Sequence, residues 1–181
     1  MKIRTDFPFK INTIRHIWIP MPDGCRLAAR IWLPENSEKH PVPAILEYIP
    51  YRKNDGTAIR DSIYHPYFAG YGYAAVRVDM RGSGDSDGVM LDEYLPQELE
   101  DAVSVIAWLA EQPWCDGTVG MMGKSWGGFN SLQVAALRPP CLKAIITVCS
   151  TDDRYSDDVH YKGGCILTTD MLGWATTMLA W

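Results

Sequence analysis

The sequence predicts an α/β fold, in which helices connect the strands of a largely parallel sheet. One observation is the alternation of short apolar segments with segments whose apolar residues recur at helical spacing. A second is the run at residues 118–128, which is typical of a strand, a tight turn and a helix. Such alternation favours right-handed crossover connections.

The first half of the chain is expected to form four strands and one helix. Residues 12–19 and 25–33 have strand composition, and the Asp23-Gly24 turn between them predicts an antiparallel hairpin. The remaining elements are a strand at 42–49, a short helix at 62–71 that ends at Gly70 or Gly72, and a strand at 73–79. The last strand is apolar enough for a sheet that is covered on both faces.

The second half contains the clearest helix of the chain, which begins near Pro96 and ends before Pro113. Acidic residues in its first turns complement the helix dipole. Its predicted apolar stripe consists of Leu99, Val103, Ile106 and Leu109 or Ala110. A strand at 118–122, a helix at 129–137 and a strand at 143–149 follow, which brings the predicted sheet to about six strands.

Composition argues against several classes of function. The 181 residues are 47% hydrophobic and 11% aromatic, which is enough for one globular core. The net charge of −5 and the lack of a basic cluster argue against nucleic acid as a partner. The N-terminus has no signal-peptide pattern, and no apolar run is long enough to cross a membrane. We therefore expect a cytoplasmic protein with no membrane partner.

Neither a cofactor nor a metal is expected. The five cysteines show no C-x-x-C spacing and predict reduced, mostly buried thiols rather than a disulfide or zinc framework. Residues 78–84 follow a strand and contain two glycines, but the dinucleotide-binding pattern G-x-G-x-x-G fails because position 87 is Asp. We expect a tight loop there, tied down by Arg81 and Asp85.

The most informative motif is Gly123-Lys124-Ser125-Trp126-Gly127, a G-x-S-x-G pattern between an apolar strand and a helix. In that context the pattern predicts a nucleophile elbow, a strained turn that exposes the serine hydroxyl. The flanking glycines allow the backbone to approach itself closely. Trp126 opens the helix, so its backbone N–H is expected to point at an oxyanion that forms beside Ser125.

Two other interpretations use the same residues. The bare pattern also fits a glycine-rich turn in a non-catalytic α/β module. Gly123-Lys124-Ser125 is also the end of the phosphate-binding loop G-x-x-x-x-G-K-[ST], which would make the chain a nucleotide-binding protein. That loop needs glycine where this chain has Thr118, and the intervening Val-Gly-Met-Met has strand composition.

Several blocks resemble α/β-hydrolases of the X-Pro dipeptidyl-peptidase and cocaine esterase type, which include α-amino-acid ester hydrolases. The matching stretches are residues 21–30, Pro50-Tyr51-Arg52-Lys53, residues 78–86 and residues 114–128. The resemblance implies an α/β-hydrolase fold. It also implies a serine hydrolase that cleaves a small-molecule ester or a peptide through an acyl-enzyme on Ser125.

The resemblance further implies that the Tyr51 hydroxyl is an oxyanion donor beside the Trp126 N–H. From the residues alone, Tyr51 is better explained as a packed loop aromatic with a satisfied hydroxyl. The resemblance also makes Asp158 a candidate substrate-binding residue, because amino-acid ester hydrolases hold the substrate ammonium with carboxylates. The alternative is that Asp158 belongs to a solvated acidic loop.

The catalytic acid and histidine are expected to lie beyond residue 181. Both follow the serine in this fold, and the resemblance places them after two later strands. His160, the one histidine after Ser125, is better explained as a loop histidine paired with a carboxylate. We interpret the chain as an N-terminal portion, with a sheet core at 1–149 and the start of a cap at 150–181. On its own it is expected to be inactive.

Overall fold

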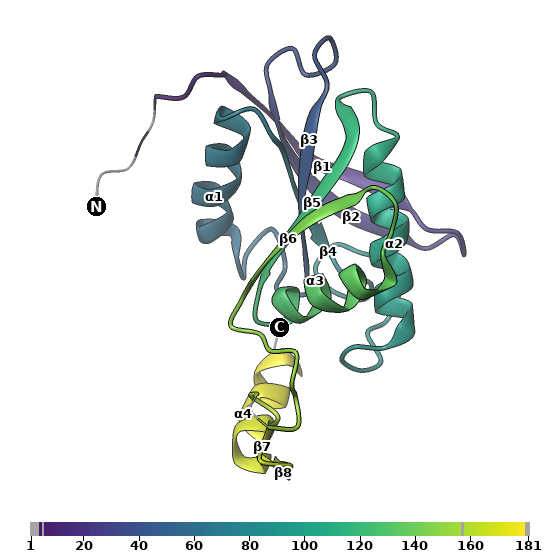
Figure 1. Ribbon diagram of the computed structural model, residues 1–181, viewed down its shortest axis with the longest axis vertical. Helices are drawn as coiled ribbons and strands as arrows, with labels where there is room; N and C mark the ends of the chain where they lie inside the picture. Colours follow the sequence, from purple (N-terminus) through teal and green to yellow (C-terminus); the bar gives the residue numbers. More distant parts are fainter. Residues whose placement is uncertain (1–3, 5, 157, 180–181) are drawn as a thin grey trace.

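The fold is a mixed six-stranded sheet with helices on both faces (Figure 1). The computed structural model describes residue 4, residues 6–156 and residues 158–179. Its strands are β1 (Ile11–Pro20), β2 (Arg26–Pro34), β3 (Val42–Ile49), β4 (Ala74–Asp79), β5 (Cys115–Lys124) and β6 (Leu142–Val148). Their order is β1-β2-β4-β3-β5-β6, with antiparallel pairing of β2 to β1 and β4 and parallel pairing elsewhere. The predicted α/β class and the six strands are confirmed.

Three helices connect the parallel strands. Helix α1 (Ala58–Gly70) packs on one face, against β2 and β4, whereas α2 (Pro96–Ala110) and α3 (Trp126–Leu137) pack on the other, against β3 and β5 (Figure 1). Because β3 lies between β4 and β5, the carboxyl ends of these three strands meet at one edge of the sheet. Open parallel sheets bind their ligands at this edge.

Helix α2 buries only part of the predicted stripe: Ile106 and Leu109 are buried, as predicted. The residues that it buries are Glu98, Asp101, Ala102, Val105, Ile106 and Leu109. Leu99 and Val103 are only half-buried. The two acids face inward because each has a partner there: Trp126 Nε1 donates to Glu98 Oε1 at 2.6 Å, and Arg81 Nε donates to Asp101 Oδ2 at 2.7 Å. An acidic side chain that has a hydrogen-bond partner can be buried at a position where helical periodicity predicts an apolar residue.

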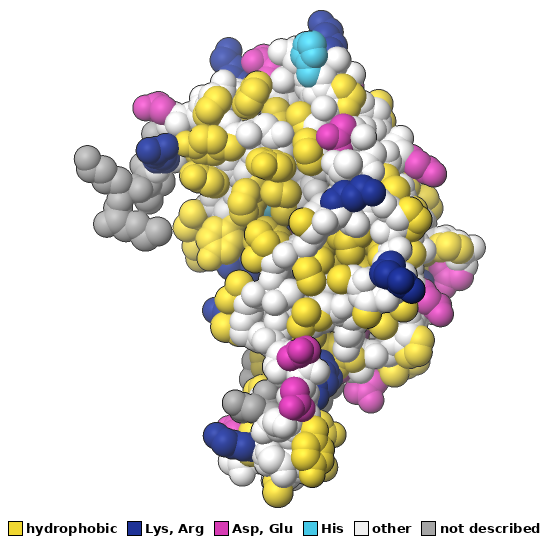
Figure 2. Space-filling view, in the orientation of Figure 1, with side chains coloured by type: hydrophobic (Ala, Val, Ile, Leu, Met, Phe, Trp, Pro, Cys, Tyr) yellow, Lys and Arg dark blue, Asp and Glu magenta, His cyan; other side chains and the backbone are white. Residues whose placement is uncertain are grey.

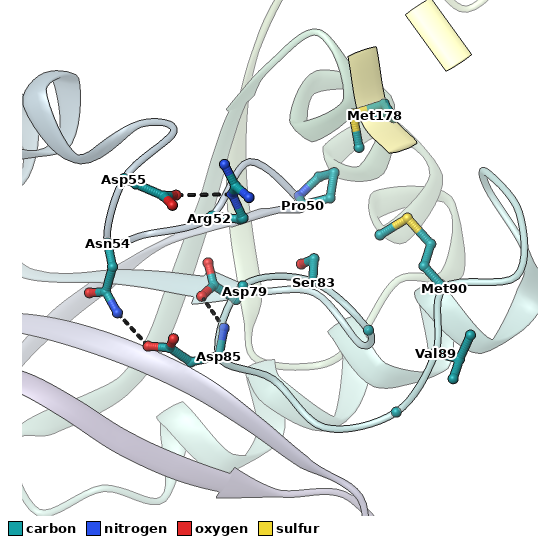
Figure 3. Close-up of a pocket in the computed structure, with 13 residues that line it drawn as sticks. Pro50, Arg52, Asn54, Asp55, Asp79, Ser83, Asp85, Val89, Met90 and Met178 are labelled. Atoms are coloured by element: carbon teal, nitrogen blue, oxygen red, sulfur yellow. Dashed lines mark hydrogen bonds and ion pairs between the residues drawn. The ribbon is translucent and has the colours of Figure 1, made fainter. Parts of the chain in front are cut away.

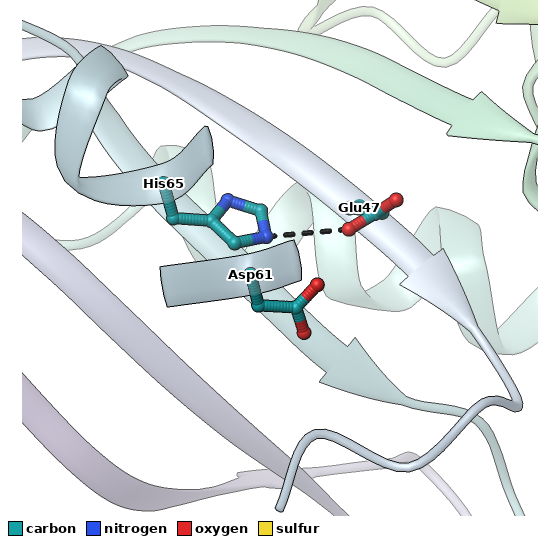
Figure 4. A group of neighbouring side chains, drawn as sticks. All are labelled: Glu47, Asp61 and His65. Carbon is teal, nitrogen blue, oxygen red and sulfur yellow. Dashed lines mark hydrogen bonds and ion pairs between the residues drawn. The ribbon is translucent and has the colours of Figure 1, made fainter. Parts of the chain in front are cut away.

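Helix α1 begins at Ala58 rather than at residue 62, because its first turn is anchored by charge. Figure 4 shows Asp61 and His65 of this helix facing Glu47 of β3. The Nη2 atom of Arg60 lies 2.7 Å from Glu47 Oε2 and 2.9 Å from Asp61 Oδ1. A helix face that is buried but polar carries no apolar period, so its start is invisible to hydrophobic patterning.

The C-terminal segment lies outside the sheet, at the bottom of Figure 1. It contains a two-stranded ribbon, β7 (Tyr161–Lys162) and β8 (Cys165–Ile166), and helix α4 (Thr168–Leu179). Glu93 ties the segment to the main body: its Oε1 accepts a hydrogen bond from Trp174 Nε1 at 2.8 Å, and its Oε2 lies 2.7 Å from His160 Nε2. That this segment begins a cap stays a prediction.

Burial is uneven across the sheet. All six residues of β4 are buried, as the sequence predicts. In β6, by contrast, Ile146 is 63% exposed, and an apolar groove of about 400 Å³ runs along the sheet face beside it. Figure 2 shows hydrophobic side chains gathered on this face. Among the described elements, β6 is an edge strand with a neighbour on one side only.

The prediction of mostly buried thiols is wrong. All five cysteines are free, but only Cys115 is buried, whereas Cys149 and Cys165 are exposed. Cys149 directly follows edge strand β6, and Cys165 lies in the small β7–β8 ribbon. Among the helices of the described residues, none has the length and apolar character needed to span a bilayer. The cytoplasmic location stays a prediction.

Candidate active site

Ser125 occupies a sharp turn between β5 and α3. Its backbone has φ 57° and ψ −120°, a conformation that non-glycine residues rarely adopt. Its N–H donates to Val148 O of the neighbouring strand at 2.8 Å, and its carbonyl accepts from Gly128 N at 2.8 Å and Phe129 N at 3.0 Å. Ser125 is thus the last residue paired with the sheet and the cap of the helix, as the elbow motif predicts.

The two glycines of the motif are required by close contact. A Cβ on Gly123 would lie 2.1 Å from the backbone carbon of Gly127, and a Cβ on Gly127 would lie 2.3 Å from Ile49 Cγ2. Neither position leaves room for a methyl group unless the helix moves. The glycines therefore let α3 start directly against the ends of β5 and β3.

The Tyr51 hydroxyl meets the Ser125 side chain. Tyr51 follows β3 directly, and its phenol is hydrogen-bonded both to the side chain of Ser125 and to the backbone N–H of Trp126. Burial raises the pKa of Tyr51 above its usual value, and these two hydrogen bonds oppose the rise only in part. The phenol therefore stays protonated at neutral pH and can donate. The structure therefore brings together Ser125, Tyr51 and Trp126, the three residues predicted to be catalytic; their catalytic role stays a prediction.

Trp126 is held by Glu98, one of the acidic residues in the first turns of α2 that were expected only to complement the helix dipole. Glu98 accepts hydrogen bonds from the indole Nε1 of Trp126 at 2.6 Å and from the backbone N–H of Tyr94 at 2.8 Å. Burial raises the pKa of Glu98, partly offset by these donors. The contact fixes the first residue of α3 to the start of α2. No sequence signal marks Glu98, because its partner is 28 residues away.

Asp158 lies on the wall of a pocket beside Ser125. The pocket has a volume of about 570 Å³ and is lined by Ser125, Phe129, Cys149, Ser150, Thr151, Asp158 and Val159. The Asp158 side chain is 1% exposed, and its Oδ1 accepts from the backbone N–H groups of His160 and Tyr161. Burial raises the pKa of Asp158, but these N–H groups outweigh it and leave the pKa below its usual value. The carboxylate is therefore ionised, and it is not freely solvated.

The ring of His160 is paired with two carboxylates. Its Nε2 lies 2.7 Å from Glu93 Oε2, and its Nδ1 lies 3.2 Å from Asp158 Oδ2. Both ring nitrogens therefore face carboxylates. This is the loop histidine paired with a carboxylate that the sequence analysis favoured over a general base.

The geometry argues against a phosphate-binding loop. Residues 119–124 pair with β6 in parallel, and residues 119–121 also pair with β3. Their backbone N–H groups are therefore committed to the sheet and cannot cradle a phosphate. The strand also extends from Cys115 to Lys124, beyond the predicted 118–122.

A buried group of potential metal ligands is already neutralised. Glu47, Asp61 and His65 offer ligand atoms within 4.8 Å of one another (Figure 4). However, the guanidinium of Arg77, which is fully buried, lies 3.3 Å from Asp61 Oδ2 and 3.9 Å from Glu47 Oε2, and Arg60 contacts both carboxylates. Two cations beside two carboxylates leave no negative charge to attract a metal ion.

A second pocket lies beside the loop that carries Tyr51. It has a volume of about 610 Å³, and Figure 3 shows Arg52, Asp79, Asp85 and Met178 among its lining residues. Arg52 forms an ion pair with Asp55 at 2.9 Å. The two pockets therefore lie at the edge where β3, β4 and β5 end.

The chain matches a known protein family. A model of the X-Pro dipeptidyl-peptidase (S15 family) matches residues 23–181. The chain belongs to this family. The resemblance seen in the sequence is confirmed.

The relatives of the chain include proteins named as esterases and peptidases. It is 36% identical over 163 residues to a cocaine esterase of Rhodococcus sp. (strain MB1 Bresler), an alignment that covers 88% of this chain and 27% of the esterase. It is 26% identical over 130 residues to an Xaa-Pro dipeptidyl-peptidase of Lactobacillus helveticus (strain DPC 4571), covering 62% of this chain and 16% of the peptidase. The chain thus spans about a quarter or less of the length of these relatives.

Solved structures confirm the α/β-hydrolase fold. A CocE/NonD family hydrolase from Staphylococcus aureus superimposes with a TM-score of 0.77 at 25% identity, covering 93% of this chain and 33% of that one. An α-amino acid ester hydrolase superimposes with a TM-score of 0.66 at 25% identity, covering 92% of this chain and 30% of that one. The S15 chain described here therefore spans about a third of the length of these two solved hydrolase chains.

The contacts of the turn predict which glycine of β5 is essential. Gly123→Ala should lower the free energy of unfolding by about 3 kcal/mol or more, because the methyl group would overlap the backbone of Gly127. Gly120→Ala is the matched control: its nearest atom is 3.7 Å away, so the loss should stay below about 1 kcal/mol. Urea unfolding followed by circular dichroism measures both, and equal losses would contradict the close approach.

Proposed function

We propose that this protein is a serine hydrolase that cleaves an ester or amide through an acyl-enzyme on Ser125. One observation carries the proposal: the Tyr51 phenol is hydrogen-bonded both to the side chain of Ser125, which is held in a strained turn, and to the Trp126 N–H. A nucleophile and two hydrogen-bond donors are the parts that acyl transfer needs at the carbonyl group.

Each residue has a chemical role in this proposal. Ser125 Oγ attacks the carbonyl carbon, and its proton passes to a general base while negative charge develops on the carbonyl oxygen. The Tyr51 hydroxyl and the Trp126 N–H donate to that oxygen, and the N-terminus of α3 adds its positive dipole. The base returns the proton to the departing alcohol or amine. Water then attacks the acyl group and regenerates Ser125.

We assign the general base and its acid to a part of the native protein outside the 181 residues. His160 is unsuited to the task because both its ring nitrogens face carboxylates. The contacts of His160, rather than its position in the chain, argue against a role as the general base. The 181-residue chain alone should therefore not turn over substrate.

The nucleophile is tested by covalent labelling. In the intact native protein, Ser125→Ala should abolish labelling by a fluorophosphonate, because the reagent reacts only with an activated hydroxyl. Ser150→Ala is the control, since Ser150 lines the same pocket and should leave the labelling unchanged. Native-level labelling of Ser125→Ala, detected by mass spectrometry, would refute the assignment.

Removal of the Tyr51 hydroxyl tests the oxyanion donor. Tyr51→Phe should lower kcat by about 10²-fold or more, which corresponds to the loss of one donor in a preorganised site. Tyr94→Phe serves as the control. The ring centroids of Tyr94 and Trp126 lie 5.3 Å apart, and the proposal gives the Tyr94 hydroxyl no role in the reaction. An unchanged kcat in Tyr51→Phe, measured with an activated ester, excludes the hydroxyl from the reaction.

Asp158 is the residue that we propose to favour substrates with an ammonium group. Its ionised carboxylate shares a pocket wall with Ser125, so a substrate with a free α-amino group should bind better than the same ester without it. Asp158→Asn should lower kcat/KM about tenfold for the amino ester and much less for the des-amino ester. Equal losses for both esters would show that Asp158 only holds its loop.

A further inference from the structure

The loop that carries Tyr51 is held at both ends by charged side chains of β4. Ahead of Tyr51, Arg77 Nη1 donates to the carbonyl oxygen of Ile49 at 3.1 Å. After Tyr51, the backbone N–H of Lys53 donates to Asp79 Oδ1 at 2.8 Å. Both Arg77 and Asp79 are buried. Side chains of β4 therefore hold the backbone on both sides of Tyr51.

Lys53 adds a second connection, which is unusual because its side chain is completely buried. Its Nζ lies 3.6 Å from Asp79 Oδ2 and forms an ion pair with Asp85 Oδ2. Figure 3 shows the Asp85 carboxylate beside the Asn54 amide, and the backbone N–H of Asp85 donates to Asp79 Oδ2 at 3.2 Å. Lys53 thus joins the loop after β3 to the loop after β4.

A buried ammonium is confined by its counter-charges. Leaving it without them is costly, so the chain at Lys53 can occupy only the position in which both carboxylates are within reach. Arg52, between Tyr51 and Lys53, has a positive φ of 50°, so the backbone at this point is also strained. Strain of this kind persists only where surrounding contacts hold it, and the ion pairs of Lys53 supply such contacts.

We propose that Lys53 is a positioning residue, which holds the Tyr51 hydroxyl in place through its buried ion pairs with Asp79 and Asp85. The inference rests on the proposed role of Tyr51 in oxyanion stabilisation. Lys53 itself does not touch the substrate. It acts because a donor displaced by about 1 Å loses most of its effect on the transition state.

A double-mutant cycle distinguishes positioning from a general contribution to folding. Lys53→Met replaces the ammonium with an apolar side chain of similar length. In the intact native protein it should lower kcat by about 10²-fold and change KM by less than about twofold, because the lost interaction is made only in the transition state. The double variant Lys53→Met/Tyr51→Phe should be no slower than Tyr51→Phe alone, within about threefold.

Asp85 and Asp87 provide a matched pair of variants at partly exposed acids. Both lie in the loop after β4, both side chains are 39% exposed, and both form an ion pair, Asp85 with Lys53 and Asp87 with Arg26. Asp85→Ala should lower kcat about tenfold, whereas Asp87→Ala should leave it within about twofold of the native value. Thermal unfolding of each variant confirms that it is folded at the assay temperature.

The outcomes separate this inference from the proposed function. If Tyr51→Phe lowers kcat but folded Lys53→Met or Asp85→Ala does not, the positioning role is wrong and the proposed function stands. Losses that multiply in the double variant also overturn it, because Lys53 would then act independently of Tyr51. If Tyr51→Phe has native kcat, the oxyanion role fails, and positioning of that hydroxyl fails with it.

Discussion

The rest of the site depends on the close approach of α3 to the end of β5. Without a Cβ at Gly123 and Gly127, the helix begins while the strand is still paired, and Ser125 is left in a backbone conformation that side chains rarely occupy. This strain costs free energy, which the sheet pairing of Ser125 on one side and the first turn of α3 on the other offset. The same approach brings the Trp126 N–H, which no helical carbonyl can satisfy, beside the serine side chain.

Buried charge organises the sheet edge around this turn. The described part of β4 carries Arg77 and Asp79, which contact the loop after β3, while Glu98 of α2 holds the Trp126 indole. Buried ions of this kind contribute little net stability, because desolvation opposes their attraction. They do favour one arrangement strongly, since any other leaves a charge unpaired. The loops after β3 and β4 and the start of α3 are therefore held in one arrangement beside Ser125.

Membership of the S15 family and the likeness to larger hydrolases agree with this organisation. The 181 residues contain the nucleophile elbow and the neighbouring loops, and they span about a third of the solved hydrolase chains that they match. The pocket beside Ser125 is formed where β5 and β6 end and where the segment after β6 returns over the sheet edge.

The strands, the elbow and the family could be predicted from the sequence alone, because each depends on local features: apolar periodicity, turn residues, and glycines at a fixed distance from a serine. The grouping of Ser125, Tyr51 and Trp126 could also be predicted, although for Tyr51 only through the resemblance. The inward acids of α2, the polar face of α1 and the buried ammonium of Lys53, by contrast, depend on how the elements pack against one another. Their partners lie 13 to 32 residues away in the chain, and burial of a charge depends on a partner that no local pattern reveals.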